Sequence, residues 1–357
     1  MDVSAKITGI KYLPFLCRKL NTYSINNLNE ALSKDGTFIV TIDEKKQLAL
    51  SWWVSAKRTR SYPYARVYDS LSFQGKKVTL IPLFKDEGKE GDRDFLQWDT
   101  VSLMSLLNVY AIISYYSDAE QSSRYKHKIT NQRFDMIPLK EEIYNLLPYQ
   151  SDALDWNLTQ IEKVGEIGQK ALNSYAKISK KLDVDMHSEK SAKKRIEELL
   201  KGKENFMNLS RGLAKKAQSR ESITVQPKEK LTGNKATLTI KNNLGGHYFF
   251  TCDEVIINKE NIYLIEGKHS EQSSIPSLED IKDGLLKMIL FTNLKEVKIR
   301  DKEFSPFAIL KLTSNEKFSK ESLRKSQVEQ LRLLKKEAEE NQFQVSINDK
   351  NLKDIGL

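Results

Sequence analysis

The sequence predicts an α/β protein, α+β overall, that is built from more than one domain. Its 357 residues exceed the usual size of a single domain. Alternating apolar and polar residues, the pattern of half-buried strands, occur before about residue 150 and again after residue 223. Between these regions, Ile, Leu and Ala recur at helical spacing. We therefore predict an N-terminal segment (1–150), a helical middle region (151–222) and a C-terminal domain (223–357).

The N-terminal segment is predicted to be a mixed unit with a meander of antiparallel strands. One helix is expected over 13–32, and another, capped by Asp99 or Thr100, over the apolar stretch 101–116. The polar loop 85–94 is acidic enough to hold a metal but has no matching Glu-x-Lys strand, so we interpret it as a structural or recognition loop. The expected strands are 37–42, 48–54, 65–73 and 77–84.

The helical middle region carries most of the positive charge. Helices are expected over 155–182 and 188–219, with a break at 183–187. From residue 177 to residue 230, fifteen Lys and Arg stand against eight Asp and Glu, which gives +7 of the chain's net charge of +10. Such a basic surface favours a polyanion such as DNA, because binding releases condensed counterions. A solvated helix face is the alternative interpretation.

The C-terminal domain is predicted to follow the order helix, three strands, helix, strand. Its first helix is expected within 200–222. The second helix, 277–293, has Ser277 as its N-cap and Asp280 at the capping-box position. The expected strands are 236–240, 247–257, 262–268, 295–300 and 307–312, followed by a charged helix over 319–341 and an edge strand over 342–347.

One hairpin of this domain is predicted to place three charged side chains on the same face of a sheet. Two apolar strands flank a polar turn, and a hairpin symmetric about that turn pairs Ile257 with Ile262. The same register brings Asp253 directly opposite Glu266, with Cβ atoms about 5 Å apart. Lys268 lies two residues beyond Glu266 and therefore shares that face.

This arrangement has the parts that phosphodiester hydrolysis needs. Two carboxylates at such a separation repel each other, and a divalent cation relieves the repulsion. Oxygen ligands suit Mg²⁺, for which Mn²⁺ can substitute, so we predict that Asp253 and Glu266 bind this metal. The metal polarises a phosphate oxygen and lowers the pKa of bound water, while Lys268 stabilises developing negative charge. A surface salt bridge between Glu266 and Lys268 is the alternative interpretation.

These residues resemble the PD-(D/E)XK nuclease superfamily, in particular type II restriction endonucleases. The resemblance rests on Asp253, on the Glu-Gly-Lys sequence at 266–268 and on the order of the surrounding elements. The stretch 275–288 is also similar to restriction enzymes of this group, and the whole resemblance covers roughly residues 200–312. It implies a restriction-endonuclease-like αβββαβ core, metal binding by the two acids and assistance of the hydrolytic water by the lysine.

The chain departs from the family pattern at one position and leaves another open. Cys252 stands where the family name has proline, a position that varies widely among such enzymes. The family often adds an acidic residue from the preceding helix. Glu197 and Glu204 are the candidates here, and nothing in the sequence selects between them.

Two neighbours of the catalytic positions are candidate supporting residues. A shift of one residue in the hairpin register would turn Glu254 to the catalytic face, which makes it a candidate alternative ligand, or a residue that supports the ligands. His269 follows Lys268 and points to the opposite face, where it could contact phosphate. The alternative for His269 is a histidine that merely ends a strand.

Two basic stretches are candidate DNA contacts. The run 57–66 interleaves cations with aromatic residues, and such residues bind guanine, phosphate or an exposed base. A solvated loop is the alternative interpretation of this run. The patch 211–216 is expected to face phosphates. The candidate DNA-binding residues are Arg58, Arg60, Tyr62, Tyr64, Arg66, Arg211, Lys215 and Lys216.

Together these patterns predict a type II-like restriction endonuclease that hydrolyses double-stranded DNA at a specific sequence with Mg²⁺. The N-terminal segment and the helical region are expected to recognise and grip the DNA. A homodimer, at least on DNA, is expected because both strands must be cut. Two alternatives stay open: a structure-specific repair or recombination nuclease of the same fold, and a DNA-binding protein without catalytic activity.

The chain is expected to act in the cytoplasm, away from membranes. Apolar residues make up 39% of it, but none of its apolar stretches approaches the ~20 residues of a membrane span. The N-terminus lacks the pattern of a secretion signal. Cys17 and Cys252 provide neither a disulfide framework nor a zinc-binding spacing, so we interpret them as free thiols in a reducing compartment.

Overall fold

The chain forms two compact units with a mixed α+β fold. A computed structural model describes residues 1–356 except 44, 57–62, 201–233, 243–246 and 317. The N-terminal unit comprises Lys19–Ser210, and the C-terminal unit comprises Met1–Arg18 together with Arg211–Leu357. This division differs from the predicted one at residues 150 and 222, because the first residues of the chain pack with its C-terminal part.

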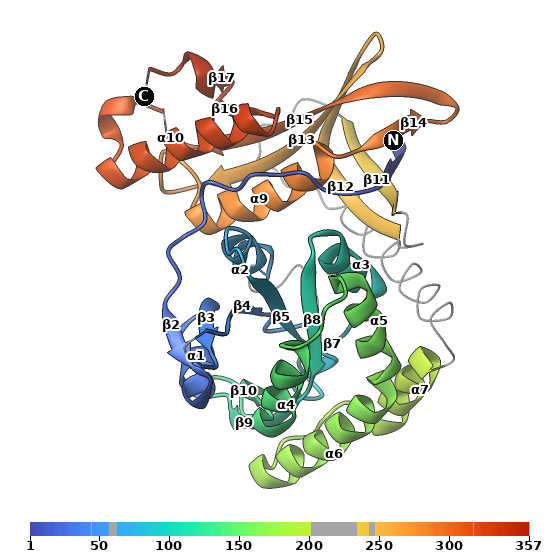
Figure 1. Cartoon of the computed structure of the whole chain (residues 1–357). Coiled ribbons are helices and arrows are strands. Elements are labelled where there is room, and N and C mark those ends of the chain that lie inside the picture. Colours follow the sequence, from blue (N-terminus) through green and yellow to red (C-terminus); the bar gives the residue numbers. More distant parts are fainter. Residues whose placement is uncertain (44, 57–62, 201–233, 243–246, 317, 357) are drawn as a thin grey trace. The chain divides into compact units, whose positions relative to one another are not determined.

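The C-terminal unit is built on one large mixed sheet (Figure 1). Its strands pair in the order β13-β12-β11-β1-β14-β15-β16-β17, and β13 pairs with β15 as well, so the strands from β13 to β15 close a ring. The strands are β1 (Asp2–Ile7), β11 (Asn234–Asn242), β12 (His247–Asn258), β13 (Asn261–Ser270), β14 (Lys295–Ile299), β15 (Lys302–Ser314), β16 (Gln344–Ile347) and β17 (Lys350–Asn351).

The helix α9 (Leu278–Phe291) connects β13 to β14 and packs on β13 and β15 (Figure 1). Ser277 caps it as predicted, because the Ser277 hydroxyl accepts a hydrogen bond from the backbone N–H of Asp280 at 3.1 Å. The predicted order strand, strand, strand, helix, strand is confirmed from β11 to β15. The helix expected within 200–222 falls largely outside the described residues. Farther along, α10 (Lys325–Glu340) packs on β16, and η2 (Lys320–Ser322) and η3 (Leu352–Asp354) flank them.

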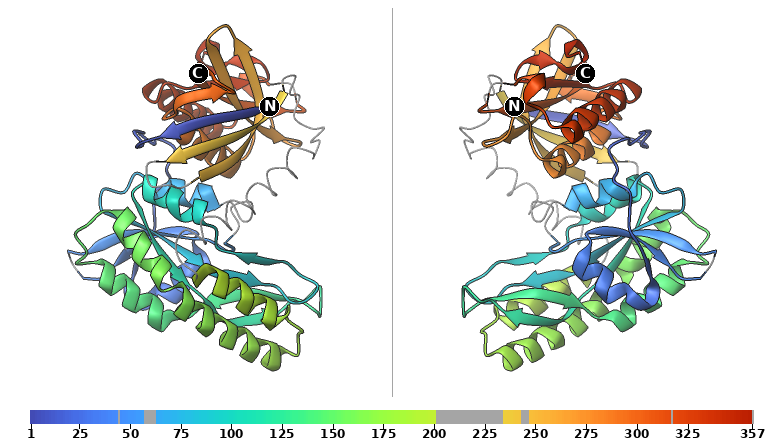
Figure 2. Two further views of the ribbon diagram at one scale, coloured as in Figure 1. Left: turned by 90° about the vertical axis from the view of Figure 1, so that its right-hand side faces the viewer. Right: turned by 90° about the vertical axis from the view of Figure 1, so that its left-hand side faces the viewer.

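The strand β1 completes this sheet from the other end of the chain. It runs parallel to β11 and antiparallel to β14, and Figure 2 shows the blue β1 beside the yellow β11. Val3, Ala5 and Ile7 are buried while the residues between them are exposed. This alternation is the sequence signal for a strand, and the sequence analysis missed it.

The predicted helix over 13–32 is wrong at its start. The residues between β1 and β2 (Thr22–Ser24) have no helix, and the helix α1 begins only at Leu28 and ends at Lys34. Pro14 disfavours helical backbone at Leu13, the first residue of the predicted helix. Instead, side chains bind this arm: Glu337 of α10 accepts a hydrogen bond from the backbone N–H of Phe15 at 2.8 Å.

The sheet of the N-terminal unit is mainly parallel. Its order is β2-β3-β4-β5-β8, and the β3–β4 pair is antiparallel while the β2–β3, β4–β5 and β5–β8 pairs are parallel. The predicted antiparallel meander is therefore wrong. The remaining strands and helices of this part are β3 (Thr37–Thr41), β4 (Gln47–Trp52), β5 (Lys76–Pro82), β8 (Val109–Ser114), η1 (Ile25–Asn27), α2 (Pro63–Ser70) and α3 (Trp98–Leu106).

Two predicted elements of this unit have a different secondary structure. The stretch 65–73, predicted as a strand, lies mostly in α2, where Tyr64, Val67 and Tyr68 have the i, i+3, i+4 spacing of a buried helix face. The predicted helix 101–116 divides into α3 and β8 at Asn108, whose φ of 53° ends the helix. Every residue of β8 is buried, and such an apolar run cannot be told from a buried helix by its periodicity.

The helices of the middle region pack into the N-terminal unit. They are α5 (Ala153–Glu162), α6 (Val164–Leu182) and α7 (Glu189–Leu200), and α4 (Met136–Leu146) precedes them in the same unit. The break after α6 is confirmed, since Asp183 has a left-handed φ of 52°. Side chains of α5 bind the backbone of β8: Asn157 accepts a hydrogen bond from the N–H of Ala111 at 2.6 Å. Two short hairpins complete the unit, β6 (Phe84–Asp86) with β7 (Arg93–Phe95) and β9 (Tyr116–Gln121) with β10 (Ile129–Phe134).

The loop 85–94 is held by its own buried carboxylate. Asp86 accepts hydrogen bonds from the backbone N–H of Gly88 at 3.0 Å, and its Oδ1 lies 2.8 Å from Nδ1 of His187. These contacts agree with the interpretation of a structural loop. Within the part of the chain that the structure describes, no helix combines the length and the apolar character needed to cross a membrane.

The contribution of β1 to the C-terminal unit can be measured with one substitution. Ile7 is fully buried, so we expect Ile7→Ala to lower the free energy of unfolding of this unit by about 2–5 kcal/mol in urea denaturation. The control is Lys6→Ala on the exposed face of the same strand. Lys6 forms only a surface ion pair with Glu296 at 2.7 Å, and its loss should cost less than about 1 kcal/mol. Equal losses for both variants would contradict the packing of β1.

Candidate active site

The register predicted for the β12–β13 hairpin is confirmed. In the ladder between β12 and β13, Ile257 pairs with Ile262, and the last pair is Glu254 with Ile265. The turn between the strands is tight, with Lys259 in the left-handed region at a φ of 57°. The predicted pair of Asp253 and Glu266 therefore lies one step beyond the end of the regular ladder.

Asp253 lies at a β-bulge that turns it toward Glu266. Between the pairs Ala236–Cys252 and Asn234–Val255, β12 has one residue more than β11. Bulges of this kind redirect a side chain and are frequent beside active sites. The carboxylate of Asp253 accepts a hydrogen bond from the backbone N–H of Gly267 at 2.9 Å. Asp253 also lies close enough to Glu266 to be among the groups that influence its pKa.

Glu266 is a buried carboxylate between two ammonium groups. Its side chain is 2% exposed, its Oε1 lies 3.0 Å from Nζ of Lys268, and its Oε2 lies 2.7 Å from Nζ of Lys287. Burial alone would raise the pKa of Glu266, but the charges of Lys287 and Lys268 outweigh it and hold the pKa at about 2. Glu266 is therefore ionised at neutral pH, as a metal ligand must be.

Lys268 is held between two carboxylates. Besides Glu266, its Nζ lies 2.8 Å from Oδ2 of Asp283 on α9. Burial lowers the pKa of Lys268, yet Glu266 and Asp283 raise it well above its ordinary value. The lysine stem needs the small residue Gly284, because a Cβ there would lie 3.2 Å from Cε of Lys268 and 2.7 Å from Cδ1 of Leu310. The alternative of a surface salt bridge does not describe this pair, since the Lys268 side chain is only 17% exposed.

The four charged residues form a continuous chain of ion pairs, Asp283–Lys268–Glu266–Lys287, which we call the ionic chain. Two members come from β13 and two from α9. Asp283 and Lys287 are four residues apart and therefore lie on one face of the helix. The sequence analysis missed both of them. Their spacing within a helix predicted to follow the Glu-x-Lys strand was the available signal.

The two candidate supporting residues lie near the site but outside the ionic chain. Glu254 is 1% exposed and stands opposite Ile265, so the register shift that would bring it to the catalytic face does not occur. His269 places its Nδ1 2.9 Å from Oγ1 of Thr313 on β15. This contact agrees with the interpretation of a histidine that ends a strand.

Cys252 is a structural thiol. It is fully buried, and its Sγ donates to the backbone carbonyl of Ile265 at 3.3 Å. Burial and the nearby charge of Glu266 raise its pKa well above the ordinary value, so the thiol stays protonated and neutral. Cys17 is half-buried and is not part of a disulfide.

The candidate DNA contacts are only partly described by the structure. Tyr64 is 5% exposed and packs edge-on against Trp53, with ring centroids 6.1 Å apart. The guanidinium of Arg66 stacks over Trp52 at 4.4 Å and donates to its backbone carbonyl at 2.9 Å. Both side chains therefore take part in the packing of the N-terminal unit. Arg58, Arg60, Tyr62, Arg211, Lys215 and Lys216 lie outside the described residues.

Comparisons with known proteins give no relative from which a role could be transferred. The chain matches no family model, no curated protein and no solved structure.

Asp253 and Glu266 together suit a magnesium ion. Mg²⁺ usually binds one or two protein carboxylates and keeps several waters. Within the described ranges, no cluster of three or more His, Cys, Asp or Glu side chains could hold a metal. Of the two candidates for a further acidic ligand, Glu197 lies on α7 of the N-terminal unit, and Glu204 lies outside the described residues.

The low pKa of Glu266 gives a pH test of the ionic chain. The ordinary pKa of 4.5 is lowered to about 2 in the folded protein, so the ionised carboxylate stabilises the fold above about pH 4.5 and loses this effect as the pH falls toward 2. Glu266→Gln removes the carboxylate charge that two buried ammonium groups share. We therefore expect this variant to be less stable than the wild type at pH 7, with a difference that shrinks below about pH 4.

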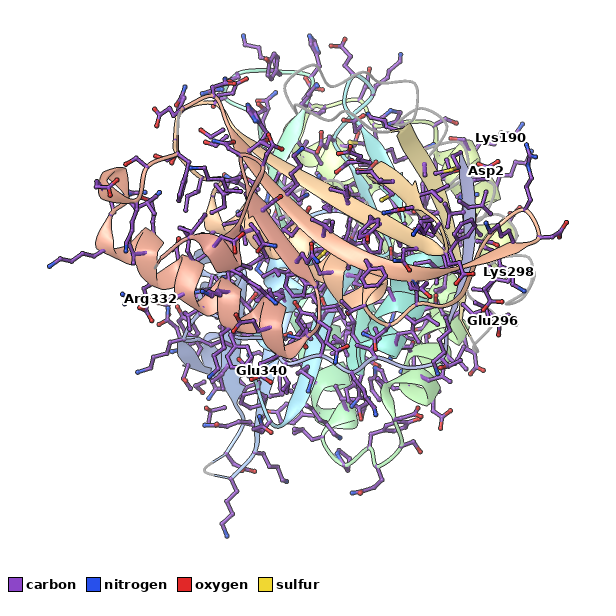
Figure 3. All side chains as sticks on the ribbon, turned by 90° about the horizontal axis from the view of Figure 1, so that it is seen from above. Asp2, Lys190, Glu296, Lys298, Arg332 and Glu340 are labelled. Carbon is purple, nitrogen blue, oxygen red and sulfur yellow. The ribbon has the colours of Figure 1, made fainter. Side chains whose placement is uncertain are left out.

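Urea denaturation between pH 3 and pH 7 measures this difference. The control is Glu340→Gln, an exposed residue at the end of α10 that Figure 3 labels, which should change stability by less than about 0.5 kcal/mol. A stability loss in Glu266→Gln that is the same at every pH would mean that the carboxylate charge is not its cause.

Proposed function

We propose that the chain is a type II-like restriction endonuclease that hydrolyses double-stranded DNA at a specific sequence and depends on Mg²⁺. The observation that carries this proposal is the meeting of Asp253, Glu266 and Lys268 at one end of the β12–β13 hairpin. The bulge in β12 and the hairpin register position Asp253 and Glu266. The helix α9 contributes the charged residues that pair with Lys268 and Glu266. Burying several charges is costly unless they are paired or bind a metal.

Asp253 and Glu266 are the proposed metal ligands. Asp253 lies close enough to Glu266 to influence its pKa, and a cation bound by both would relieve the repulsion between two ionised carboxylates. When bound, the metal would supply a polarised phosphate oxygen and a water of lowered pKa. Glu266 is kept ionised for this purpose by the two neighbouring lysines.

Lys268 is the proposed cation for the phosphate. In the hydrolysis, the water oxygen forms a bond to phosphorus, the bond from phosphorus to the leaving oxygen breaks, and the leaving oxygen takes up a proton. Negative charge on the phosphoryl oxygens rises in the transition state, and a fixed ammonium group stabilises it. Asp283 supports this role because it holds the ammonium group of Lys268 at 2.8 Å.

Sequence recognition and dimer formation belong to the same proposal. The N-terminal unit is the proposed reader of the DNA sequence. Two active sites are needed to cut both strands in one binding event, so a homodimer on DNA is part of the proposal. A repair or recombination nuclease of the same fold would prefer junctions or flaps to intact duplex, and that preference separates the two nuclease functions.

A DNA-binding protein without catalysis is the second candidate, and one observation favours it. Both oxygens of Glu266 are already paired with ammonium groups, and buried ion-pair networks can be purely structural. In that case the protein would shift DNA in a gel but would not cut it with Mg²⁺.

Digestion of unmethylated plasmid and phage DNA with and without Mg²⁺ tests the proposed activity. We expect discrete fragments with common ends in the presence of Mg²⁺, as read by sequencing of the ends. We expect Lys268→Ala to retain specific binding but to cut at least about a hundredfold more slowly, because a charge that stabilises the transition state is lost.

Lys350→Ala is the matched control, since Lys350 is exposed on β17 at the edge of the sheet. It should cut at the wild-type rate. Cleavage by Lys268→Ala at the wild-type rate would remove Lys268 from the catalytic residues, and DNA binding without any cleavage by the wild type would support the non-catalytic candidate.

A further inference from the structure

Lys287 of α9 stands where the proposed metal site needs a cation. Its Nζ lies 2.7 Å from Oε2 of Glu266, and its side chain is 16% exposed. Burial lowers the pKa of Lys287, but Glu266 and then Asp253 raise it well above the ordinary value. Both carboxylates of the proposed metal pair therefore act on this one ammonium group.

The two lysines on Glu266 are not equivalent. Lys268 lies on the same strand as Glu266 and is also held by Asp283 at 2.8 Å, so a second carboxylate keeps it in place. Lys287 reaches Glu266 from the helix and pairs with the other oxygen. A metal ligated by Glu266 would have to compete with an ammonium group for one of these two oxygens. Asp253 also raises the pKa of Lys287, so this ammonium group lies near both proposed metal ligands, where a shared cation would bind.

We propose that Lys287 is the built-in counter-ion of the Asp253–Glu266 pair, and that a divalent cation binds there in exchange for its ammonium group. This inference rests on the proposed metal site and adds a residue to it. In the metal-free protein, Lys287 neutralises the buried carboxylate and preserves the fold of the site. When the cation enters, the displaced ammonium group becomes available to a phosphate beside the metal.

The exchange has a thermodynamic consequence. A cation that must displace a resident positive charge binds more weakly than one that enters a free carboxylate pair. Removing the charge of Lys287 should therefore strengthen metal binding while it weakens the metal-free fold. If the Lys287–Glu266 ion pair were purely structural, removing it should weaken metal binding, because the loss of packing would loosen the metal ligands.

Titration of the full-length protein with Mn²⁺ alone, followed by calorimetry or by the electron paramagnetic resonance of free Mn²⁺, tests the exchange. We expect Lys287→Gln to bind Mn²⁺ at least about tenfold more tightly than the wild type, because repulsion between close charges is removed. Lys287→Arg keeps the charge and should bind within about threefold of the wild type, and the exposed control Lys350→Gln should be unchanged.

Glu266→Gln distinguishes a failure of the exchange at Lys287 from a failure of the proposed metal site. If this variant loses Mn²⁺ binding but Lys287→Gln binds no more tightly than the wild type, the metal site stands and the exchange is wrong. If Glu266→Gln binds Mn²⁺ like the wild type, or the wild type binds none, the proposed metal site itself is wrong, and the exchange falls with it.

A measurement on the wild-type protein covers the case in which Lys287→Gln fails to fold. An amine-reactive reagent and mass spectrometry report the accessibility of each lysine with and without saturating Mn²⁺. We expect labelling of Lys287 to rise with Mn²⁺ while that of Lys350 stays constant. Labelling of Lys287 that stays constant or falls would overturn the exchange.

Discussion

The C-terminal unit depends on the neutralisation of one buried carboxylate. Glu266 is 2% exposed in its side chain and is ionised, and an unpaired charge in such a position would cost several kcal/mol. Lys268 and Lys287 offset that cost, because each pairs with one oxygen of Glu266. Asp283 in turn pairs with Lys268. The packing of α9 on β13 and β15 is therefore tied to the chemistry of the site, because the helix brings two of the four charges.

The same dependence explains several features of the fold that have no other evident reason. The bulge in β12 turns Asp253 toward Glu266. Gly284 has no Cβ, so α9 can approach the sheet closely. Asp283 of the same helix thereby reaches Lys268. The strand β1, which comes from the opposite end of the chain, closes the ring of strands on which these elements rest. A site of this kind needs a rigid support, since small displacements of charged groups have large effects on catalysis.

The sequence was sufficient for the parts of the site that depend on local patterns. The β12–β13 hairpin could be predicted because a polar turn between two apolar strands sets its register, and Ser277 marked the start of α9. Asp283 and Lys287 could not be assigned, because their contacts depend on where the helix crosses the sheet. The position of Asp253 depends on a bulge against β11, and β1 pairs with residues more than 200 positions away in the chain. In the N-terminal unit, the buried strand β8 was misjudged because an apolar run of its length fits either a strand or a helix, and the helical spacing of Tyr64, Val67 and Tyr68 in α2 was overlooked.

A crystal structure of the protein with Mn²⁺ and DNA, using the anomalous scattering of manganese to locate the ion, tests the central claim most directly. The structure of the site predicts an anomalous peak in contact with Asp253 and Glu266, with Lys268 still beside Glu266 and Lys287 moved away from it. Manganese bound elsewhere, with Glu266 still paired to both lysines while DNA is in place, would contradict the claim that this buried cluster of charges is a nuclease site.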